Sequence, residues 1–519
     1  MSKVCRNKTR GKMDKIFKFL TSRIFVVSLL IFIQISMITL IMIYLSWMYI
    51  PIYILFMAIS FIIVIAIINR NNNPMFKIAW IIPVLAFPIC GALFYLMFGR
   101  THLNKKNRTR LKKAIESANG VIKMNEEALQ FVGTRNSHIQ REANYIIGSS
   151  RSNLYLSTET QFLSPGSLFF RELIPELKKA ERFIFLEYFI IGEGKMWGEI
   201  LDILKEKIAV GVEVRLMYDD IGCINNLPLD FPEKMRKLGI KTAVFNPYRP
   251  SIDPFLNYRD HRKFAIIDGR VAFTGGINIA DEYINEKERF GFWEDASVKL
   301  EGDAVNKTTV LFLEMWYFST GELPVYTDYI VDYKAQHDGV VIPFSDEPLF
   351  PELVCENAYL NIINDARKYV YICTPYLILD NVMEASLIRA AKSGIHVVIL
   401  TPHKPDKKLV FLMTRSNYKT LIESGCEIYE FTPGFMHTKM IISDDETAIV
   451  GTSNFDYRSF YLHFENGVWM NRCKAVNQAR DSFLRTLEVS EKVTSDIVDN
   501  VSFGTKVLRS ILKMFAPLL

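Results

Sequence analysis

One pattern of five residue types occurs twice in this chain and predicts a fold built from two related halves. The pattern is a histidine, a lysine two positions later, and then an aspartate, a glycine and an asparagine at fixed spacings. The copies are His261, Lys263, Asp268, Gly275 and Asn278, and His437, Lys439, Asp444, Gly451 and Asn454. Two histidines and two lysines brought together would form a basic pocket for a phosphodiester.

The segments ahead of the two motifs repeat one order of predicted elements. The order is strand, helix, strand, at residues 182–191, 199–211 and 212–220 and again at 368–379, 384–394 and 395–402. Strands alternating with helices predict a parallel sheet covered by helices. We therefore expect an α/β fold of two similar subdomains packed face to face, at residues 161–335 and 336–519.

The motif spacing predicts how each copy is arranged locally. His261 and Lys263 are two residues apart, so on a strand their side chains leave the same face. The strand after them should turn at Asp268-Gly269 and return as a hairpin. Asp268 is an odd number of residues from His261, which favours a role in the turn over contact with the imidazole. The second copy repeats this logic with Lys439 and Asp444.

The glycines and asparagines of the motif are candidate phosphate-binding residues. Gly275 and Gly451 would let the backbone approach a phosphate closely. The side-chain amides of Asn278 and Asn454 could donate to its non-bridging oxygens.

A histidine that acts as nucleophile or acid-base usually has a carboxylate on its other ring nitrogen. Asp295 and Glu465 lie in strand-like stretches shortly after the two motifs and are candidates for this role. Each could equally be an ordinary edge-strand carboxylate. His463 precedes Glu465 and could approach the site, whereas the remaining histidines lack the motif spacing and are expected in surface or packing roles.

The paired motif resembles the phospholipase D superfamily, whose signature is a doubled HxKxxxxD, over roughly residues 160 to 519. The whole chain is similar to the bacterial cardiolipin synthases. It shares their hydrophobic N-terminus, the sequences GGINIADEY and GTSNFDYRS after the motifs, and a C-terminus of the PLL type, here FAPLL.

The resemblance implies that the two motifs meet across a pseudo-twofold axis in one active site. One histidine would become phosphohistidine and the other would act as general acid and base, with a carboxylate beyond each motif orienting its histidine. It implies a catalytic set of His261, Lys263, Asp268, His437, Lys439 and Asp444, with Asp295 and Glu465 in the orienting role. Choosing His261 as the nucleophile follows the family, because the two copies are nearly symmetric.

The implied reaction is a phosphatidyl transfer between two phosphatidylglycerols that gives cardiolipin and glycerol, with no metal or cofactor. The alternative is a phospholipase D-type hydrolase of phospholipid or nucleic-acid phosphodiesters, in which water resolves the intermediate. The motif residues do not separate these two reactions. The sequence has no Gly-rich nucleotide loop or acidic metal cluster, and its seven cysteines show no metal-ligand spacing or disulfide framework.

Residues 1–100 are predicted to anchor the chain in a membrane. Residues 24–46 and 50–68 are uncharged stretches of 23 and 19 residues, and a bilayer core requires about 20. Pro51 is expected in the short turn between these two spans. A third hydrophobic segment, residues 78–98, is interrupted by two prolines and a glycine. It is either a kinked span or a re-entrant or interfacial segment.

The charge distribution favours a multi-pass protein of the cell membrane with a cytoplasmic catalytic region. Residues 1–113 carry a net charge of +16, which leaves −10 for residues 114–519 in a chain of net charge +6. The basic run 100–113 opens a predicted helical linker, residues 101–160, and positive residues favour the cytoplasmic side. These residues could also attract anionic lipids. A net-acidic catalytic region is a poor match for nucleic acid.

The C-terminus is predicted to form an amphipathic helix. Val507, Leu508, Ile511, Leu512 and Phe515 share one face at helical spacing. This face could dock on the body of the protein or lie in the membrane interface. The sequence leaves both readings open.

Overall fold

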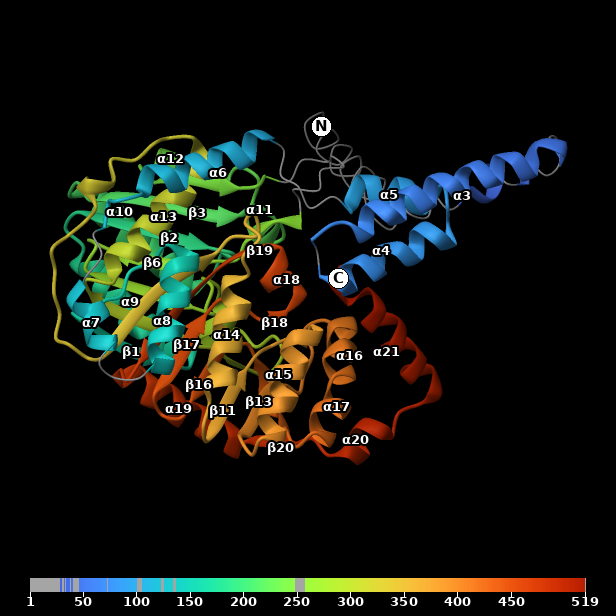
Figure 1. Ribbon diagram of the computed structural model, residues 1–519. Helices are drawn as coiled ribbons and strands as arrows, with labels where there is room; N and C mark the ends of the chain where they lie inside the picture. The colour runs from blue at the N-terminus through green and yellow to red at the C-terminus, as the bar shows by residue number, and fades with distance from the viewer. Residues whose placement is uncertain are drawn as a thin grey trace. The chain divides into compact units, whose positions relative to one another are not determined.

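The computed structural model describes residues 29, 32, 34–37, 39–40, 46–71, 73–99, 105–122, 126–133, 137–247 and 257–518 (Figure 1). The chain divides into two compact units. The helical unit comprises residues 1–104, 248–257 and 514–519, and the α/β unit comprises residues 105–247 and 258–513.

The first half of the α/β unit is built on a seven-stranded sheet. Across the sheet, the strands are β1 (Thr158–Leu163), β9 (Ser297–Gly302), β7 (Val271–Gly275), β6 (Phe264–Ile267), β2 (Phe183–Tyr188), β3 (Glu213–Asp219) and β4 (Lys241–Phe245). Strands β2, β3 and β4 are parallel, and the remaining neighbours are antiparallel.

The second half repeats this sheet. Its strands are β10 (Val340–Asp346), β19 (His463–Asn471), β17 (Thr447–Gly451), β16 (Met440–Ser443), β11 (Tyr369–Cys373), β13 (His396–Pro402), β14 (Glu427–Phe431) and the additional edge strand β20 (Ser490–Lys492). Apart from β20, each strand has its counterpart at the same place in the first sheet. The duplication predicted from the motif, and with it the fold class, is confirmed.

The prediction of a parallel sheet holds only for the three strands on one side of each sheet. The strands that carry the motifs form the hairpins β6–β7 and β16–β17, which enter the sheets antiparallel to β2 and β11. A short turn can join only antiparallel neighbours, whereas parallel strands need a long crossover. Each sheet is therefore mixed.

Helices in equivalent positions cover the two sheets (Figure 1). They are α9 (Gly166–Lys179), α10 (Lys195–Ala209) and α13 (Val305–Thr320) in the first half, and α14 (Val354–Asp365), α15 (Asn381–Lys392) and α19 (Lys474–Glu488) in the second. Gly211 and Gly394 follow the ends of α10 and α15 with φ angles of 92° and 89°. This left-handed conformation favours glycine and ends the helix at the same place in each half.

Each half buries its own hydrophobic core. Residues 101–160, predicted as a helical linker, contain α6 (Lys105–Ala118), α7 (Glu126–Gly133) and α8 (Ser137–Ser150). Ala143 and Ile146 of α8 belong to the core of the second half, and Glu142 accepts a hydrogen bond from the buried Trp469 indole at 2.9 Å. This helix is therefore packed into the α/β unit.

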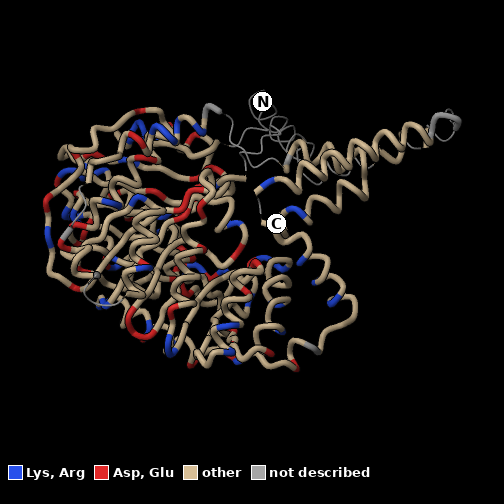
Figure 2. The backbone as a smooth tube through the Cα atoms, viewed as in Figure 1, with Lys and Arg blue, Asp and Glu red and all other residues tan. Residues whose placement is uncertain are grey.

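The helical unit contains α3 (Ser46–Ile68), α4 (Pro74–Ala86) and α5 (Cys90–Phe98). Within the described residues, Ile50–Ile68 is the one helical stretch long and apolar enough to cross a membrane. Figure 2 shows α3 without charged residues, in agreement with its sequence. The ammonium group of Lys77 donates to the carbonyl of Ile68 at 2.8 Å, which satisfies a free acceptor at the end of α3.

Two predictions for this region are modified by the structure. Pro51 lies inside α3 and not in a turn; its ring removes one backbone hydrogen bond of the helix without ending it. The predicted third segment is two helices, because α4 ends at Ala86 and α5 begins at Cys90, with Pro88 between them. Most of the predicted first span, residues 24–46, lies outside the described residues.

Candidate active site

His261 and Lys263 lie in an extended link between two strands, and not on a strand as predicted. The preceding strand, β5 (Arg259–Asp260), pairs in parallel with β19 of the second half, so the motif residues link two strands that belong to different sheets. The backbone amide of His261 donates to the Phe464 carbonyl at 2.9 Å. The next residue, Glu465, accepts from His261 Nδ1 with Oε1 at 3.0 Å and Oε2 at 2.9 Å.

The second histidine is held in the same way by the first half. Strand β15 (Gly434–Met436) pairs in parallel with β8 (Phe292–Glu294), and the amide of His437 donates to the Glu294 carbonyl at 2.7 Å. Asp295 follows, and its Oδ2 accepts from His437 Nδ1 at 2.6 Å. His437 and Lys439 also lie in the link before a strand, so the strand prediction is wrong for both copies.

Each carboxylate therefore serves the histidine of the other half, which corrects the expectation that it orients the histidine of its own motif. The cause is the exchange of short strands between the halves, which local spacing does not reveal. Asp295 and Glu465 are both fully buried. A buried carboxylate needs such partners, so neither is an ordinary edge-strand residue.

The first pair consists of a neutral imidazole and an ionised carboxylate. Burial lowers the pKa of His261 to about 3, against the opposing charge of Glu465. Burial alone would raise the pKa of the Glu465 carboxyl, but the charge and hydrogen bonds of His261 and His463 hold it below its usual range. With Nδ1–H directed at Glu465, the Nε2 of His261 keeps its lone pair for a nucleophilic attack.

The second pair lies in an aromatic environment. The rings of Tyr283, Trp293 and Phe435 lie 5.5, 5.2 and 5.7 Å from the His437 ring. Burial and the charge of Lys439 lower the pKa of His437 well below its ordinary value. Burial raises the pKa of Asp295 to about 7. A phosphodiester anion bound beside His437 would raise the pKa of the imidazole.

The two motif lysines share this site with the histidines. Lys263 Nζ donates to the His261 carbonyl at 2.6 Å, and Lys439 Nζ donates to the His437 carbonyl. Burial lowers the pKa of Lys263 to about 8 and that of Lys439 to about 7, and the charge of Lys263 contributes to the lowering at Lys439 and at His437. These clustered, desolvated cations would be stabilised by a phosphodiester anion.

Asp268 and Asp444 do not contact the histidines, so counting them as catalytic is not supported. Asp268 accepts hydrogen bonds of 2.8 to 2.9 Å from three consecutive backbone amides, residues 181–183. Asp444 accepts hydrogen bonds of 2.7 to 3.0 Å from residues 367–369. Both are turn residues with positive φ, 55° and 57°, and tie the hairpin to the start of the neighbouring strand, as the spacing predicted.

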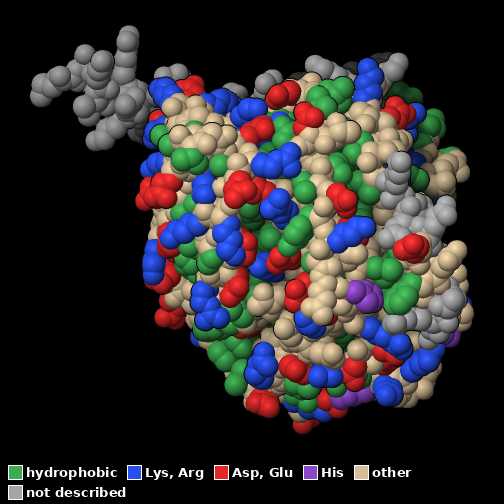
Figure 3. Space-filling view, turned by 90° about the vertical axis from the view of Figure 1, so that its left-hand side faces the viewer, with side chains coloured by type: hydrophobic (Ala, Val, Ile, Leu, Met, Phe, Trp, Pro, Cys, Tyr) green, Lys and Arg blue, Asp and Glu red, His purple; other side chains and the backbone are tan. Residues whose placement is uncertain are grey.

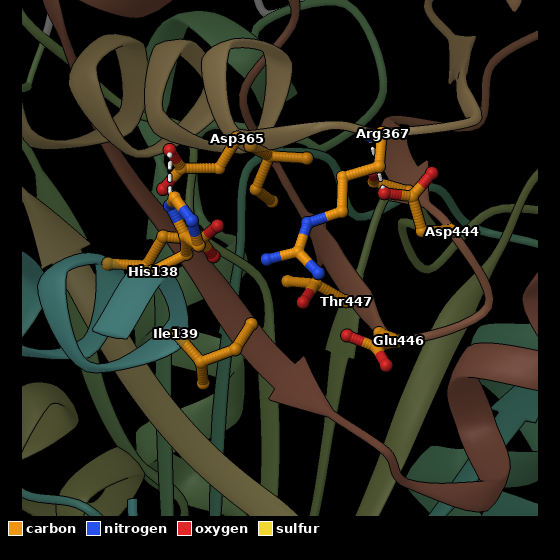
Figure 4. A pocket seen from close by; sticks show the side chains of 10 residues that line it. His138, Ile139, Asp365, Arg367, Asp444, Glu446 and Thr447 are labelled. Carbon is orange, nitrogen blue, oxygen red and sulfur yellow. Dashed lines mark hydrogen bonds and ion pairs between the residues drawn. The ribbon is translucent and has the colours of Figure 1, made fainter. Parts of the chain in front are cut away.

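A surface pocket lies beside the second of these turns. Asp444 lines it with His138, Asp365, Arg367 and Glu446 (Figure 4). It is at the end of β16 away from His437, so it is not part of the site described here.

The motif glycines serve strand packing and not phosphate approach, which corrects that expectation. A Cβ on Gly275 would lie 2.4 Å from the carbonyl oxygen of Ala296, and a Cβ on Gly451 would lie 2.5 Å from that of Asn466. The space beside each glycine is filled by the backbone of the neighbouring strand.

The two motif asparagines differ in their contacts. Asn278 accepts from the Ile190 amide at 2.9 Å and donates to the Tyr283 hydroxyl at 2.8 Å, so it also fixes a ring that contacts His437. Asn454 is buried, and its Oδ1 has no hydrogen-bond partner among the described residues. Donation to a phosphate stays a prediction for both.

Sequence reasoning missed Thr452, whose hydroxyl donates to Glu465 Oε2 at 2.5 Å. The matching position of the first copy is Gly276, where a Cβ would lie 2.0 Å from Asp295 Oδ1. The sequence signal that could have found this residue was the difference between GGIN at residues 275–278 and GTSN at residues 451–454. The threonine supports one carboxylate, and the glycine makes room for the other.

His463 does reach the site. Its ring centroid lies 5.4 Å from that of His261, and its Nδ1 lies 3.4 Å from Glu465 Oε1. One ligand atom from each of these three residues lies within 4.8 Å of the others, which is close enough to hold a metal ion. The Glu465 oxygens are already committed to His261 and Thr452, so a metal ion would compete with these contacts.

Comparisons with known proteins match both halves of the α/β unit and part of the helical unit. A family described as cardiolipin synthase, phospholipase D-like domain, matches residues 173–316 and 359–487, and one described as phospholipase D-nuclease N-terminal matches residues 58–100. A cardiolipin synthase of Alkalihalophilus pseudofirmus is 35% identical over 483 residues, covering 91% of this chain and 95% of that protein. An uncharacterized protein of Streptococcus mutans is 41% identical, covering 88% and 99%.

The fold has a solved counterpart in a phosphatidylserine synthase from Haemophilus influenzae. The TM-score is 0.56 at 14% identity, covering 74% of this chain and 98% of that one. The family match and the paired motifs thus define an enzyme of the phospholipase D superfamily, a phosphatidyltransferase. Within that class, the chain belongs to the cardiolipin synthase family.

Proposed function

We propose that this enzyme transfers a phosphatidyl group from one phosphatidylglycerol to another, giving cardiolipin and glycerol. The observation that carries the proposal is the pair of crossed histidine–carboxylate contacts, 2.9 Å and 2.6 Å long, in a buried site with two lysines. Two histidines allow one phosphodiester exchange to proceed as two displacements, with the phosphatidyl group held covalently between them.

In the first displacement, His261 Nε2 attacks the phosphorus of the first phosphatidylglycerol. A P–N bond forms, and the P–O bond to the terminal glycerol breaks. His437 gives its proton to the departing glycerol oxygen. The contact of His261 Nδ1 with Glu465 leaves the Nε2 lone pair available for this attack, and the choice between the two histidines follows the family. The bound phosphodiester raises the pKa of His437 by its negative charge and so favours the protonated form needed for donation.

In the second displacement, a glycerol hydroxyl of the second phosphatidylglycerol attacks the phosphohistidine. His437 takes the hydroxyl proton, the new P–O bond forms, and the P–N bond to His261 breaks. Cardiolipin leaves, and both histidines return to their starting states. Because each step exchanges similar esters, the reaction is reversible.

Lys263 and Lys439 would stabilise the charge on the phosphoryl oxygens in both transition states. Asn278 and Asn454 would add amide donors to the same oxygens. Glu465 and Asp295 act through the histidines, whose ring orientation and tautomer they fix. The lipid chemistry of the substrates is in keeping with an apolar, charge-free α3 elsewhere in the chain.

Hydrolysis by water is the second candidate, because water could replace the lipid hydroxyl in the second displacement. The charge distribution does not support nucleic acid as the substrate. Residues 114–519 carry a net charge of −10, and the face in Figure 3 intersperses Lys and Arg with Asp and Glu. A nucleic-acid enzyme gains affinity from a basic surface.

Purified protein supplied with labelled phosphatidylglycerol separates these reactions. The proposed transfer yields cardiolipin and glycerol in equal amounts, and added glycerol converts cardiolipin back to phosphatidylglycerol. Phosphatidic acid as the sole product would identify a hydrolase. Failure of glycerol to regenerate phosphatidylglycerol would contradict the reversible transfer.

The proposed location is the cell membrane, with two spans, a third segment that does not cross fully, and a cytoplasmic catalytic unit. The basic run 100–113 and the break between α4 and α5 support this topology. Reporters fused after Phe98 and at the C-terminus test it. At both places we expect green fluorescent protein to fluoresce and alkaline phosphatase to be inactive. The reverse result would place the catalytic unit on the outer side of the membrane.

A further inference from the structure

The last long helix of the chain exposes its apolar side. Helix α21 (Phe503–Phe515) leaves Phe503 81%, Val507 41%, Leu508 40% and Ile511 48% exposed. At 3.6 residues per turn these four side chains fall on one side of the helix. Val507, Leu508 and Ile511 were predicted to share a face with Leu512 and Phe515, which are half-buried.

The side of α21 that meets the α/β unit is polar. Arg509 is only 9% exposed, and Lys513 Nζ lies 3.8 Å from Glu384 Oε1 of α15. Helix α21 runs along the outside of the second half, beside α16 (Lys408–Ser416) (Figure 1). A helix on a water-soluble protein turns its apolar side inward, and α21 has the opposite orientation.

An exposed apolar side of a helix indicates contact with lipid or with another protein surface. We propose that α21 is an in-plane membrane helix, whose exposed apolar side lies in the lipid surface while its polar side holds the α/β unit. Lys506 is exposed at the edge of the apolar side, where its ammonium group can remain at the level of the headgroups.

The sequence that follows α21 supports lipid as the occupant. Helix α21 continues directly into η4 (Ala516–Leu518), which belongs to the helical unit. Ala516 and Pro517 are buried, and Leu518 packs against the apolar cluster formed by Val64, Ile67, Trp80, Val84 and Tyr95. Two members of this cluster lie on α3, the candidate membrane span. The end of α21 is thereby tied to the helices that carry the span.

A second copy of the chain or another protein could also cover an apolar surface. Continuity with the helical unit, which carries the candidate span Ile50–Ile68, favours lipid, because chain connection alone brings α21 within a few residues of that unit. The proposal does not depend on the reaction catalysed, so its test requires no turnover.

The test measures the depth of a fluorophore on α21 in full-length protein reconstituted into vesicles of phosphatidylcholine and phosphatidylglycerol. Variants Ile511→Cys and Val507→Cys each carry an environment-sensitive dye, and the vesicles contain lipids with a nitroxide on the acyl chain. The six described native cysteines are buried, and dye on the unsubstituted protein gives the background. Two positions are labelled so that the test can still be made if one variant fails to fold.

The matched control is Val210→Cys. Val210 is 75% exposed and lies between α10 and β3, at the end of the first sheet away from His261. We expect the nitroxide lipids to quench dye at positions 507 and 511 several-fold more strongly than dye at position 210. Equal quenching at all three would overturn the proposal. So would dye at 511 that is shielded from aqueous iodide yet unquenched by lipid, since that pattern indicates a protein partner or a second copy.

Discussion

Thr452 donates its hydroxyl to Glu465 Oε2 at 2.5 Å, and the corresponding residue of the other half, Gly276, has no side chain to make such a bond. The two halves share a topology and a motif, but their carboxylates are held differently. Glu465 accepts from Thr452 and His261, whereas Asp295 accepts from His437 and from the backbone amide of Ala296 at 2.8 Å. This asymmetry accompanies the different roles proposed for the two histidines.

Thr452→Val should therefore slow formation of the covalent intermediate. Loss of a hydrogen bond to a charged group weakens the support of Glu465 by about 1.5–3 kcal/mol, which corresponds to roughly tenfold to a hundredfold in rate. Single-turnover kinetics with short-chain phosphatidylglycerol measure this step. Thr452→Ser retains the hydroxyl and should recover most of the rate; a serine variant as slow as the valine variant would show that the methyl packing matters and the hydrogen bond does not.

The proposed division between the histidines predicts which variant can be trapped. His261→Ala should abolish both turnover and the phosphatidyl adduct. His437→Ala should also block cardiolipin formation, yet accumulate adduct slowly from a substrate whose leaving group needs no protonation. Intact-protein mass after brief exposure to such a substrate distinguishes them. An adduct that persists in His261→Ala would show that the roles are reversed.

The crossed contacts make a related prediction for the carboxylates. Glu465→Gln should impair the step that requires His261, and Asp295→Asn the steps that require His437, each less severely than removal of the histidine itself. Adduct formation and adduct breakdown are measured separately. If Glu465→Gln instead impaired the steps that require His437, and Asp295→Asn the step that requires His261, the crossed assignment would be contradicted.

Lys263→Ala and Lys439→Ala should each reduce kcat by about 10²–10³, as found when a donor to developing charge is removed from an active site. Because burial disfavours the charged form of both groups, their removal should leave the thermal unfolding midpoint in detergent near that of the unsubstituted protein. Thermal melts and steady-state rates test this pair of effects. A large fall in the midpoint would indicate that the lysines serve the fold and not the reaction.

Chelators should leave activity intact, because the lysines supply the positive charge that a metal would otherwise provide. Zinc ions should inhibit, since His261, His463 and Glu465 offer ligand atoms within 4.8 Å of one another and binding would occupy the nucleophile. His463→Gln should weaken this inhibition. Activity that is lost with EDTA and restored by a divalent ion would refute the metal-independent reaction.

Acid should destabilise the α/β unit in a defined range. Burial lowers the pKa of His261 from its ordinary value of 6.5 to about 3. Between these values the unfolded chain binds more protons than the folded one, so stability is lost as the pH falls from about 6.5 toward 3. Thermal midpoints across this range should decline for the unsubstituted protein and more gently for His261→Gln. Identical slopes would exclude His261 as a source of the acid sensitivity.

Local sequence rules were sufficient for the duplication, the motif hairpins and the turn role of Asp268. They apply because a strand, a tight turn and a returning strand are set by neighbouring residues. They did not predict that Asp295 would reach His437, since that contact depends on β8 pairing with β15 from a segment more than a hundred residues later. The glycine at 275 was misjudged for the same reason: its neighbour is the β9 backbone, not a ligand.

The exchange of β5 and β15 between the halves constrains how such a chain could have arisen. In neither half does the carboxylate contact the histidine of its own motif. A half-length ancestor with one motif could complete this arrangement only by pairing with a second copy of itself. Fusion of two such copies would have preserved the site without building any new contact, and it would have freed each half to acquire its own residue at the position now occupied by Gly276 or Thr452.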